Sequence, residues 1–129
     1  MNKNIVLDAS ALLALIQEER GADVVRSLLR HAVMSAVNIA EVLTALQRVH
    51  VSPQESVGLV SDIVETIVPF DLEQARYVAE LQSQVQPKGL SLGDRACIAL
   101  GLKLQVPIYT ADKIWSQLQL DKVDIRMIR

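Results

Sequence analysis

Five short apolar runs alternate with helical patterns along the chain, and this alternation constrains the fold more than any other feature. The runs occupy residues 5–7, 33–35, 67–70, 106–110 and 123–128. Runs this short and apolar are typical of parallel strands that are buried on both faces, because connecting helices cover each face of the sheet. We therefore predict a three-layer α/β/α sandwich with a short, mostly parallel central sheet.

Helix start and stop signals fill the intervals between these runs. Residues 52–55, Ser-Pro-Gln-Glu, combine a capping residue, a first-turn proline and a capping-box glutamate. Asn38 and Glu41 fit the same cap and partner positions, and Asp23, Asp71, Ser91 and Asp112 are further candidate caps. With caps included, the expected helices run from residue 10 to the break at Gly21, and over 23–29, 38–49, 52–66, 71–86, 91–104 and 112–118. Pro87 and Gly89 should close the fifth of these.

The chain has 129 residues and no linker, repeat or low-complexity segment, which favours a single domain over residues 1–129. No apolar run approaches the roughly 18 positions that a membrane span needs, and Asp8 interrupts the first run too early for a signal peptide. The one cysteine, Cys97, excludes an internal disulfide and fits a reducing compartment. We expect a cytoplasmic protein without a membrane partner.

Charge and aromatic content leave the function open. The formal net charge is −2, whereas a basic patch is the usual mark of a nucleic-acid-binding protein. If four acidic residues share one metal site, the thirteen basic residues outnumber the remaining eleven acidic ones only slightly. The four aromatic residues also argue against a broad surface for base stacking.

Acidic side chains follow two of the predicted strands. Asp8 comes directly after residues 5–7, and Asp112 lies two residues past the strand at 106–110. In parallel sheets the ligand site lies beyond the carboxyl ends of the strands, near the point where the strand order reverses. Aspartate is also a common helix cap, so the pattern alone is equally compatible with a structural role for both residues.

Two more acids belong to predicted helices. Glu41 lies on the polar side of its helix, and the pattern by itself favours a structural role as the partner of Asn38. Asp94 heads a helix that is apolar nearly all the way round, where an unpaired carboxylate costs several kcal/mol. Ser91 is one candidate partner, whereas Arg95 points elsewhere on the helix. A cation from outside the chain is the other solution.

A shared cation is chemically reasonable for such a group. Carboxylates that lie together repel one another unless a cation neutralises them, and hard oxygen ligands favour Mg²⁺ or Mn²⁺. A bound divalent ion is sufficient for phosphodiester hydrolysis, because it activates water and stabilises the departing oxygen. His31 and His50 have no zinc-ligand spacing, Cys97 reads as a core residue, and no glycine-rich phosphate loop is present.

Four segments together resemble the PIN-domain nucleases, in particular the bacterial toxins called VapC. They span residues 6–10, 36–42, 90–96 and 109–115, in the order and spacing of that family. The resemblance implies that Asp8, Glu41, Asp94 and Asp112 are the catalytic residues and hold Mg²⁺ or Mn²⁺. It further implies that Ser10 and Thr110 support them by hydrogen bonding. It also places Glu41 in the site, whereas the sequence pattern by itself favours a structural role for this residue.

The same resemblance implies partners. Such toxins form homodimers, cut RNA such as tRNA, rRNA or mRNA, and pair with a small antitoxin whose C-terminal segment covers the acidic groove. Arg95 and Lys113 are candidate RNA contacts because each adjoins a site acid, although the pattern alone favours solvated surface charges.

Our hypothesis is an endoribonuclease that uses water to leave a 5′-phosphate and a 3′-hydroxyl, and that serves as the toxin of a toxin–antitoxin pair. One alternative is a non-catalytic PIN fold that binds RNA or protein. The other is a receiver-type phosphoacceptor domain, although its paired acid after the first strand and lysine after the last are not evident.

Overall fold

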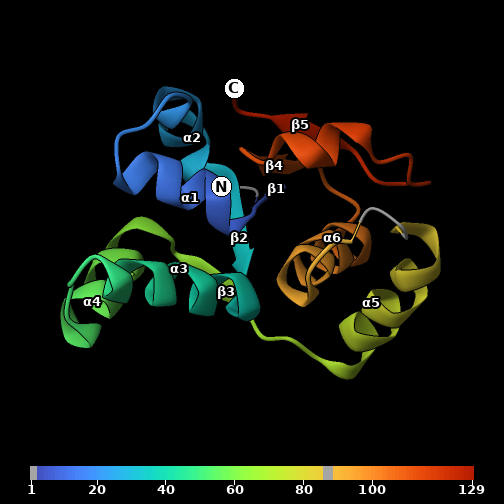
Figure 1. Cartoon of the computed structure of the whole chain (residues 1–129), viewed down its shortest axis with the longest axis horizontal. Coiled ribbons are helices and arrows are strands. Elements are labelled where there is room, and N and C mark those ends of the chain that lie inside the picture. Colours follow the sequence, from blue (N-terminus) through green and yellow to red (C-terminus); the bar gives the residue numbers. More distant parts are fainter. Residues whose placement is uncertain (1–2, 86–88) are drawn as a thin grey trace.

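A parallel sheet forms the centre of the molecule (Figure 1). The computed structural model describes residues 3–85 and 89–129, and in these residues the sheet has five strands in the order β3-β2-β1-β4-β5. The strands are β1 (Ile5–Leu7), β2 (Ala32–Ser35), β3 (Thr66–Val68), β4 (Ile108–Thr110) and β5 (Ile125–Met127). All neighbouring pairs are parallel. The five predicted strands are present, but β3 covers residues 66–68 and not 67–70, and β4 and β5 are shorter than the apolar runs that contain them.

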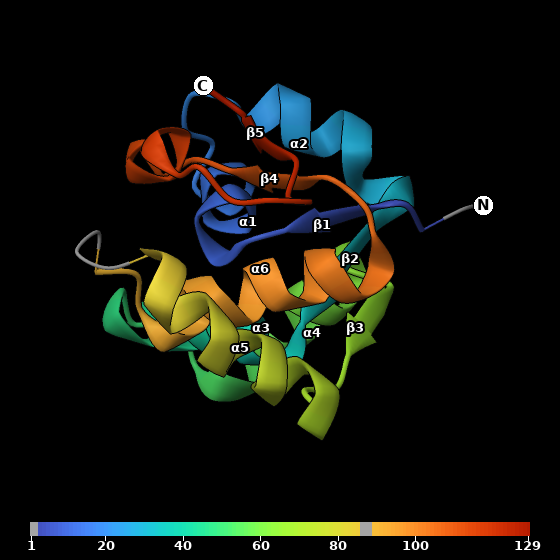
Figure 2. The ribbon, with the colours of Figure 1, turned by 90° about the vertical axis from the view of Figure 1, so that its right-hand side faces the viewer.

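Helices cover both faces of the sheet. They are α1 (Ala9–Ile16), α2 (Ala22–Leu28), α3 (Ala36–Arg48), α4 (Pro53–Ile63), α5 (Leu72–Val85) and α6 (Leu92–Leu104), with short 3₁₀ segments η1 (Leu29–His31) and η2 (Lys113–Gln117). In Figure 1, α1 to α4 lie to the left of β1 and β2, and α5 and α6 lie to the right. Figure 2 shows the molecule from the right-hand side of Figure 1, with α5 and α6 below β1 and with α2 above it. The predicted three-layer α/β/α sandwich is confirmed.

The alternation of side chains along β1 explains why the strands are so apolar. Ile5 and Leu7 pack into the core under α1 to α4, whereas Val6 packs into the core under α6. All three residues are buried. Because a strand covered on both faces has no solvent-facing side, its sequence is a continuous apolar run.

Several predicted helix boundaries were wrong. Helix α3 begins after Ser35, whose hydroxyl accepts from the Val37 N–H at 3.1 Å, so Asn38 is not the cap but a buried residue of the first turn. Helix α2 begins after Gly21, and Asp23 belongs to its first turn. Helix α4 ends at Ile63, because the chain enters β3 at the residue predicted to end the helix. The 112–118 segment is a 3₁₀ turn.

Other start signals are confirmed. Ser52, Asp71 and Ser91 each accept a backbone N–H at the beginning of α4, α5 and α6. The predicted end of α5 at Gln86 and Pro87 lies outside the described residues. Within the described ranges, none of the helices has the length and apolarity needed to cross a membrane.

The strand order places a topological switch point between β1 and β4. The chain passes from β1 to β2 and β3 on one side, and then returns through α5 and α6 to β4 on the other side of β1. Connections that diverge in this way leave a crevice beyond the carboxyl ends of the two strands. Asp8 directly follows β1, and Asp112 follows β4 by two residues.

Candidate active site

Asp8 is buried at the end of β1, with 4% of its surface exposed. Its Oδ1 accepts from the Ala11 N–H at 2.9 Å, and this bond caps α1. The Ser10 hydroxyl donates to the same carboxylate at 2.7 Å, and the Thr110 hydroxyl donates to Oδ2 at 2.6 Å. Asp8 therefore has the capping role that the sequence left open, and it also has an oriented carboxylate held by two hydroxyls.

Burial raises the pKa of Asp8 from 3.8 to about 6. Hydrogen bonds from Thr110, Ala11 and Ser10 lower the pKa and oppose part of this effect, and the negative charge of Asp94 raises it further. A carboxyl group that loses hydration favours its neutral form, so the ionised form of Asp8 is held at an energetic disadvantage. A nearby cation would remove that disadvantage.

Asp112 is tied to Asp8 through Thr110. The Asp112 N–H donates to Thr110 Oγ1 at 3.0 Å, and the Asp112 carboxylate accepts from the Ile114 N–H at 3.1 Å. The Ala111 N–H donates to Ser10 Oγ at 3.0 Å, which joins the same two segments a second time. The loops that follow β1 and β4 are thus fastened together at the switch point, with one aspartate on each.

Asp94 forms a capping box with Ser91 at the start of α6. The Asp94 N–H donates to Ser91 Oγ at 3.1 Å, and the Ser91 N–H donates to Asp94 Oδ2 at 3.2 Å. The side chain is half-buried, and burial raises its pKa, with a contribution from the charge of Asp112. The capping partner considered from the sequence is therefore present. It does not neutralise the carboxylate, because Ser91 carries no charge.

Glu41 reaches the first turn of α6 from α3. Its Oε1 accepts from Asn38 Nδ2 at 2.8 Å, and the same amide nitrogen donates to the Gly93 carbonyl at 2.9 Å. A Cβ atom on Gly93 would overlap the Glu41 carboxylate, at 2.6 Å from Oε1. The Glu41 carboxylate therefore lies against the residue that precedes Asp94.

The four acids form one electrostatic neighbourhood. Asp94 raises the pKa of Asp8, and Asp112 raises that of Asp94. Burial first, and then the charges of Asp8, Asp94 and Glu41, raise the pKa of the Cys97 thiol. Among the ion pairs between described residues, none includes any of the four acids. The group therefore carries mutually repelling charge that no described basic side chain neutralises.

The donor set fits a hard divalent cation through its chemistry. Every candidate ligand is a carboxylate or hydroxyl oxygen, and Mg²⁺ usually binds one or two carboxylates and completes its shell with water. In residues 3–85 and 89–129, however, no three acidic, histidine or cysteine side chains lie close enough together to hold one ion. An ion here would contact only part of the group directly.

The two candidate RNA contacts differ in their surroundings. Arg95 turns toward α5, where its Nη1 donates to the Val78 carbonyl at 3.2 Å, and the side chain is half-buried. Lys113 is exposed and directly follows Asp112 at the start of η2. The position of Arg95 favours a packing role for that residue.

Sequence reasoning missed two residues of the site. Asn38 was paired with Glu41 only as a helix cap with its capping-box partner, and Gly93 was not singled out, yet both contact Glu41. A signal for Asn38 was present, because residues three apart on a helix share a face. Nothing in the sequence pattern distinguishes Gly93.

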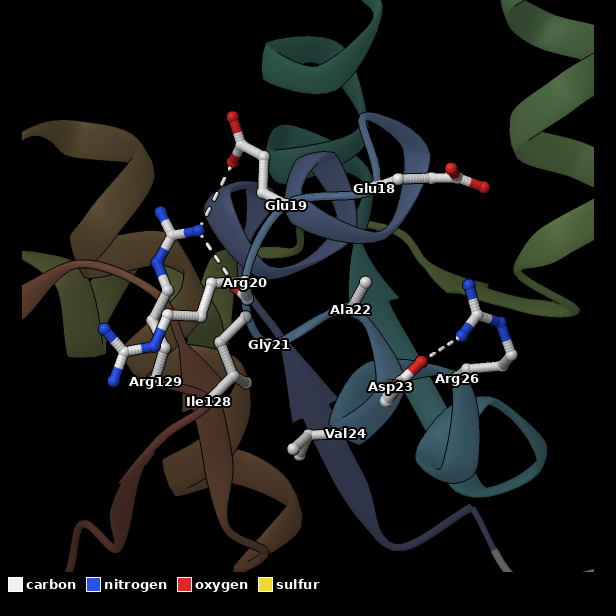
Figure 3. A pocket seen from close by; sticks show the side chains of 10 residues that line it. All are labelled: Glu18, Glu19, Arg20, Gly21, Ala22, Asp23, Val24, Arg26, Ile128 and Arg129. Carbon is white, nitrogen blue, oxygen red and sulfur yellow. Dashed lines mark hydrogen bonds and ion pairs between the residues drawn. The ribbon is translucent and has the colours of Figure 1, made fainter.

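Figure 3 shows a pocket elsewhere, between the turn joining α1 to α2 and the end of the chain. Arg129 closes one side of it by donating to the Arg20 carbonyl at 3.0 Å and to Glu19 at 3.4 Å. None of the predicted site residues lines this pocket.

Comparison with solved structures identifies the fold. A chain of DNA-bound VapBC from Salmonella typhimurium superposes with a TM-score of 0.76 at 10% identity, covering 100% of both chains. VapBC2 from Rickettsia felis, bound to a promoter DNA fragment, gives 0.74 at 12% identity, covering 95% of this chain and 97% of that one. Mycobacterium tuberculosis VapC20, described as a sarcin–ricin loop cleaving toxin, gives 0.70 at 17% identity, with 87% and 92% covered.

No curated protein sequence matches the chain. At these identities the solved structures establish the fold alone, which is that of the VapC toxins in VapBC toxin–antitoxin complexes. The sequence itself matches the PIN domain over residues 5–120. The chain therefore belongs to the PIN-domain family.

Proposed function

We propose that this chain is a metal-dependent endoribonuclease and the toxin of a toxin–antitoxin pair. The observation that carries the proposal is the group of acids at the switch point. Asp8 follows β1 and Asp112 follows β4. The charge of Asp94 raises the pKa of Asp8, and the charge of Asp112 raises the pKa of Asp94. Family membership supports nuclease chemistry at this position.

Each residue of the site has a proposed role in the reaction. Asp8, Glu41, Asp94 and Asp112 would hold the divalent ion, by direct contact or through water. Thr110 and Ser10 hold the Asp8 carboxylate in one orientation through their hydroxyl groups. When bound, Mg²⁺ or Mn²⁺ supplies charge neutralisation at the phosphate and lowers the pKa of water. In the proposed reaction, a water oxygen bonds to phosphorus as the P–O3′ bond breaks, and the proton that the water releases is balanced by protonation of O3′, which leaves a 5′-phosphate and a 3′-hydroxyl.

RNA is the proposed substrate, in the form of tRNA, rRNA or mRNA. One structural neighbour is described as a toxin that cleaves the sarcin–ricin loop, which is consistent with RNA as the target class. Several neighbours were solved as toxin–antitoxin complexes, some of them bound to DNA. We therefore include a homodimer, a small antitoxin whose C-terminal segment covers the acidic edge, and a cytoplasmic location in the proposal.

Asparagine substitution at the central acids tests the nuclease directly. Asp8→Asn and Asp94→Asn keep the side-chain shape and remove the charge, so each should slow RNA cleavage at least 100-fold in Mg²⁺ or Mn²⁺. Asp62→Asn, an exposed acid on α4, is the matched control and should cleave like the wild type. Sequencing of the RNA ends identifies the cut bond. Wild-type cleavage rates in both site variants would contradict the assignment.

A non-catalytic binding module is the second candidate. It is favoured by one observation, the absence of three closely grouped metal-binding side chains in the described residues. Binding of Mn²⁺ and RNA without cleavage of any tested RNA would support it. Membership of the PIN family leaves no reason to pursue a receiver-type domain.

A further inference from the structure

Asn38 is a buried amide between α3 and α6, with 1% of its surface exposed. We infer that Asn38 is a positioning residue, which fixes the Glu41 carboxylate against the first turn of α6 beside Asp94. This inference rests on the proposed function, because it assigns Asn38 a role in the same site. It adds a residue that does not itself touch the substrate.

The hydrogen bonds of Asn38 show how the amide acts. Nδ2 carries two N–H donors, and they bond to Glu41 Oε1 at 2.8 Å and to the Gly93 carbonyl at 2.9 Å. Both partners are acceptors, so only the nitrogen of the amide can face them. One side chain thus connects a flexible carboxylate on α3 to the backbone of α6. The bond to a charged acceptor is also the stronger kind of hydrogen bond.

The rest of the amide suggests that the residue is present for this bond rather than for stability. Asn38 Oδ1 is buried, and within the described residues it has no hydrogen-bond partner. A buried polar atom without a partner is destabilising, so an apolar residue of similar volume would suit packing alone better. Retaining a polar group at such a position is typical of sites where function opposes stability.

Gly93 completes the arrangement from the opposite side. Its missing side chain leaves the space that the Glu41 carboxylate occupies, with 2.6 Å between Oε1 and the position of an added Cβ. Glu41 is therefore oriented by Asn38 and accommodated by Gly93. Because Glu41 is otherwise exposed, these two contacts restrict a side chain that would move freely in solvent.

Two variants remove the amide with different effects on packing. Asn38→Leu roughly conserves the volume and Asn38→Ala leaves a small cavity, and both should weaken Mn²⁺ binding by roughly 10- to 100-fold. The rate constant kcat for RNA cleavage should fall by a similar factor, with the KM for RNA unchanged. If Asn38 served packing alone, the loss of Mn²⁺ affinity in each variant would follow its loss of melting temperature, and the two variants would differ.

Gln74→Leu is the matched control. Gln74 is fully buried on α5, donates through Nε2 to the Pro69 carbonyl at 2.9 Å, and also has a side-chain oxygen without a partner in the described residues. Its replacement makes a similar change in buried polarity, but away from the four acids. Mn²⁺ affinity and kcat should remain those of the wild type, whatever happens to the melting temperature.

Two further measurements separate positioning from general damage. In a Glu41→Gln background, Asn38→Leu should cause no additional loss of Mn²⁺ affinity, because the two residues act as a unit. In the metal-free protein, the side-chain amide proton resonances of Asn38 should resist solvent exchange and shift in the Glu41→Ala variant. This second measurement depends on neither the metal nor RNA cleavage.

The outcomes distinguish this inference from the proposed function. Three outcomes would each overturn the role of Asn38. The first is wild-type Mn²⁺ affinity in Asn38→Leu, and the second is an equal loss of Mn²⁺ affinity when Asn38→Leu is added to Glu41→Gln. The third is that the Asn38 resonances do not shift in Glu41→Ala. Mn²⁺ binding that depends on Asn38, without cleavage of any RNA, would support the inference and overturn only the ribonuclease. A wild-type protein that binds no Mn²⁺ would overturn both.

Discussion

The Thr110 hydroxyl donates a 2.6 Å hydrogen bond to Asp8 Oδ2 across 102 positions of sequence. The two residues meet because β1 and β4 are parallel neighbours, with Leu7 paired to Tyr109, so both chains leave the sheet at the same edge. Thr110 Oγ1 also accepts the Asp112 N–H at 3.0 Å. The Thr110 hydroxyl therefore orients the Asp8 carboxylate and also holds the backbone that leads to Asp112.

Replacing Thr110 by valine should disturb Asp8 without emptying the core. Valine conserves the volume of this fully buried side chain but removes the hydrogen bond that most strongly lowers the Asp8 pKa, so that pKa should rise above about 6. The Asp112 N–H also loses its partner, and unfolding free energy should fall by about 1–3 kcal/mol. Titration of the Asp8 carboxyl ¹³C resonance in the metal-free protein measures the shift. Thr110→Ser keeps the hydroxyl, so its Asp8 pKa should be that of the wild type. An unshifted Asp8 pKa in Thr110→Val would contradict this account.

Asp8 should make the metal-free protein less stable as the pH rises. Its pKa in the folded protein is about 6, above the ordinary 3.8, so the folded state holds this proton more tightly than the unfolded state does. The resulting stabilisation is fully present below about pH 4 and is lost as the pH rises through about 6. A difference of about two pKa units corresponds to about 3 kcal/mol, an upper bound for this buried group.

Asp8→Asn should remove this pH dependence. In urea melts with EDTA, the variant should gain stability over the wild type between about pH 4 and pH 7, because the wild type alone loses it there. Mn²⁺ should raise the wild-type midpoint at neutral pH and have less effect on the variant. Parallel pH profiles for the two proteins, or identical wild-type midpoints with EDTA and Mn²⁺, would count against a buried acid in a shared metal site.

Strand-end geometry explains how much of the site was predictable. Asp8 and Asp112 follow apolar runs, and a parallel sheet brings the ends of neighbouring strands together whatever the sequence distance between them. The same residue types cap helices, and the structure gives Asp8 and Asp112 that local role as well. The two interpretations were never exclusive, since a cap at a strand end is already at the edge where ligands bind.

The errors near Asn38 have a local cause. Ser35 and Asn38 are both good caps three residues apart, and the pattern gives no means of choosing between them. The choice is made by β2, which ends at Ser35 and leaves no residue between strand and helix. Asn38 then lies inside α3, facing Gly93 from 55 positions away. A contact of that kind depends on helix packing and has no signature in either segment alone.

Arg95 and Lys113 should separate into a packing residue and an RNA contact. Arg95→Ala removes a half-buried side chain that donates to the Val78 carbonyl, and it should lower the unfolding free energy by about 1–2 kcal/mol without weakening RNA binding. Lys113→Ala should leave stability unchanged, weaken RNA binding, and reduce the salt dependence of binding by about one ion. Both are measured in the Asp8→Asn background, where RNA is not expected to be cut. A loss of RNA affinity confined to Arg95→Ala would reverse the assignment.

Gly93→Ala should disable the site while leaving the fold intact. The added methyl group would overlap the Glu41 carboxylate, which is the far end of a flexible and exposed side chain and can move away without unfolding α3. Alanine also favours the helix over glycine, so stability should be unchanged or higher by up to about 1 kcal/mol. Mn²⁺ affinity and RNA cleavage should nevertheless fall by roughly tenfold or more, because Glu41 leaves its place beside Asp94.

Gly58→Ala is the control that makes this result specific. Gly58 lies within α4, and a Cβ built there meets no heavy atom within 4 Å apart from its chain neighbours and the nearby backbone of its own helix. The same exchange should therefore give a similar gain in helix stability, with Mn²⁺ affinity and cleavage unchanged. Thermal melts, Mn²⁺ titration and cleavage assays on the two variants give the comparison. If Gly93→Ala retains wild-type Mn²⁺ affinity and cleavage, the position of Glu41 against α6 does not matter to the site, because the methyl group cannot be added there while that carboxylate stays in place.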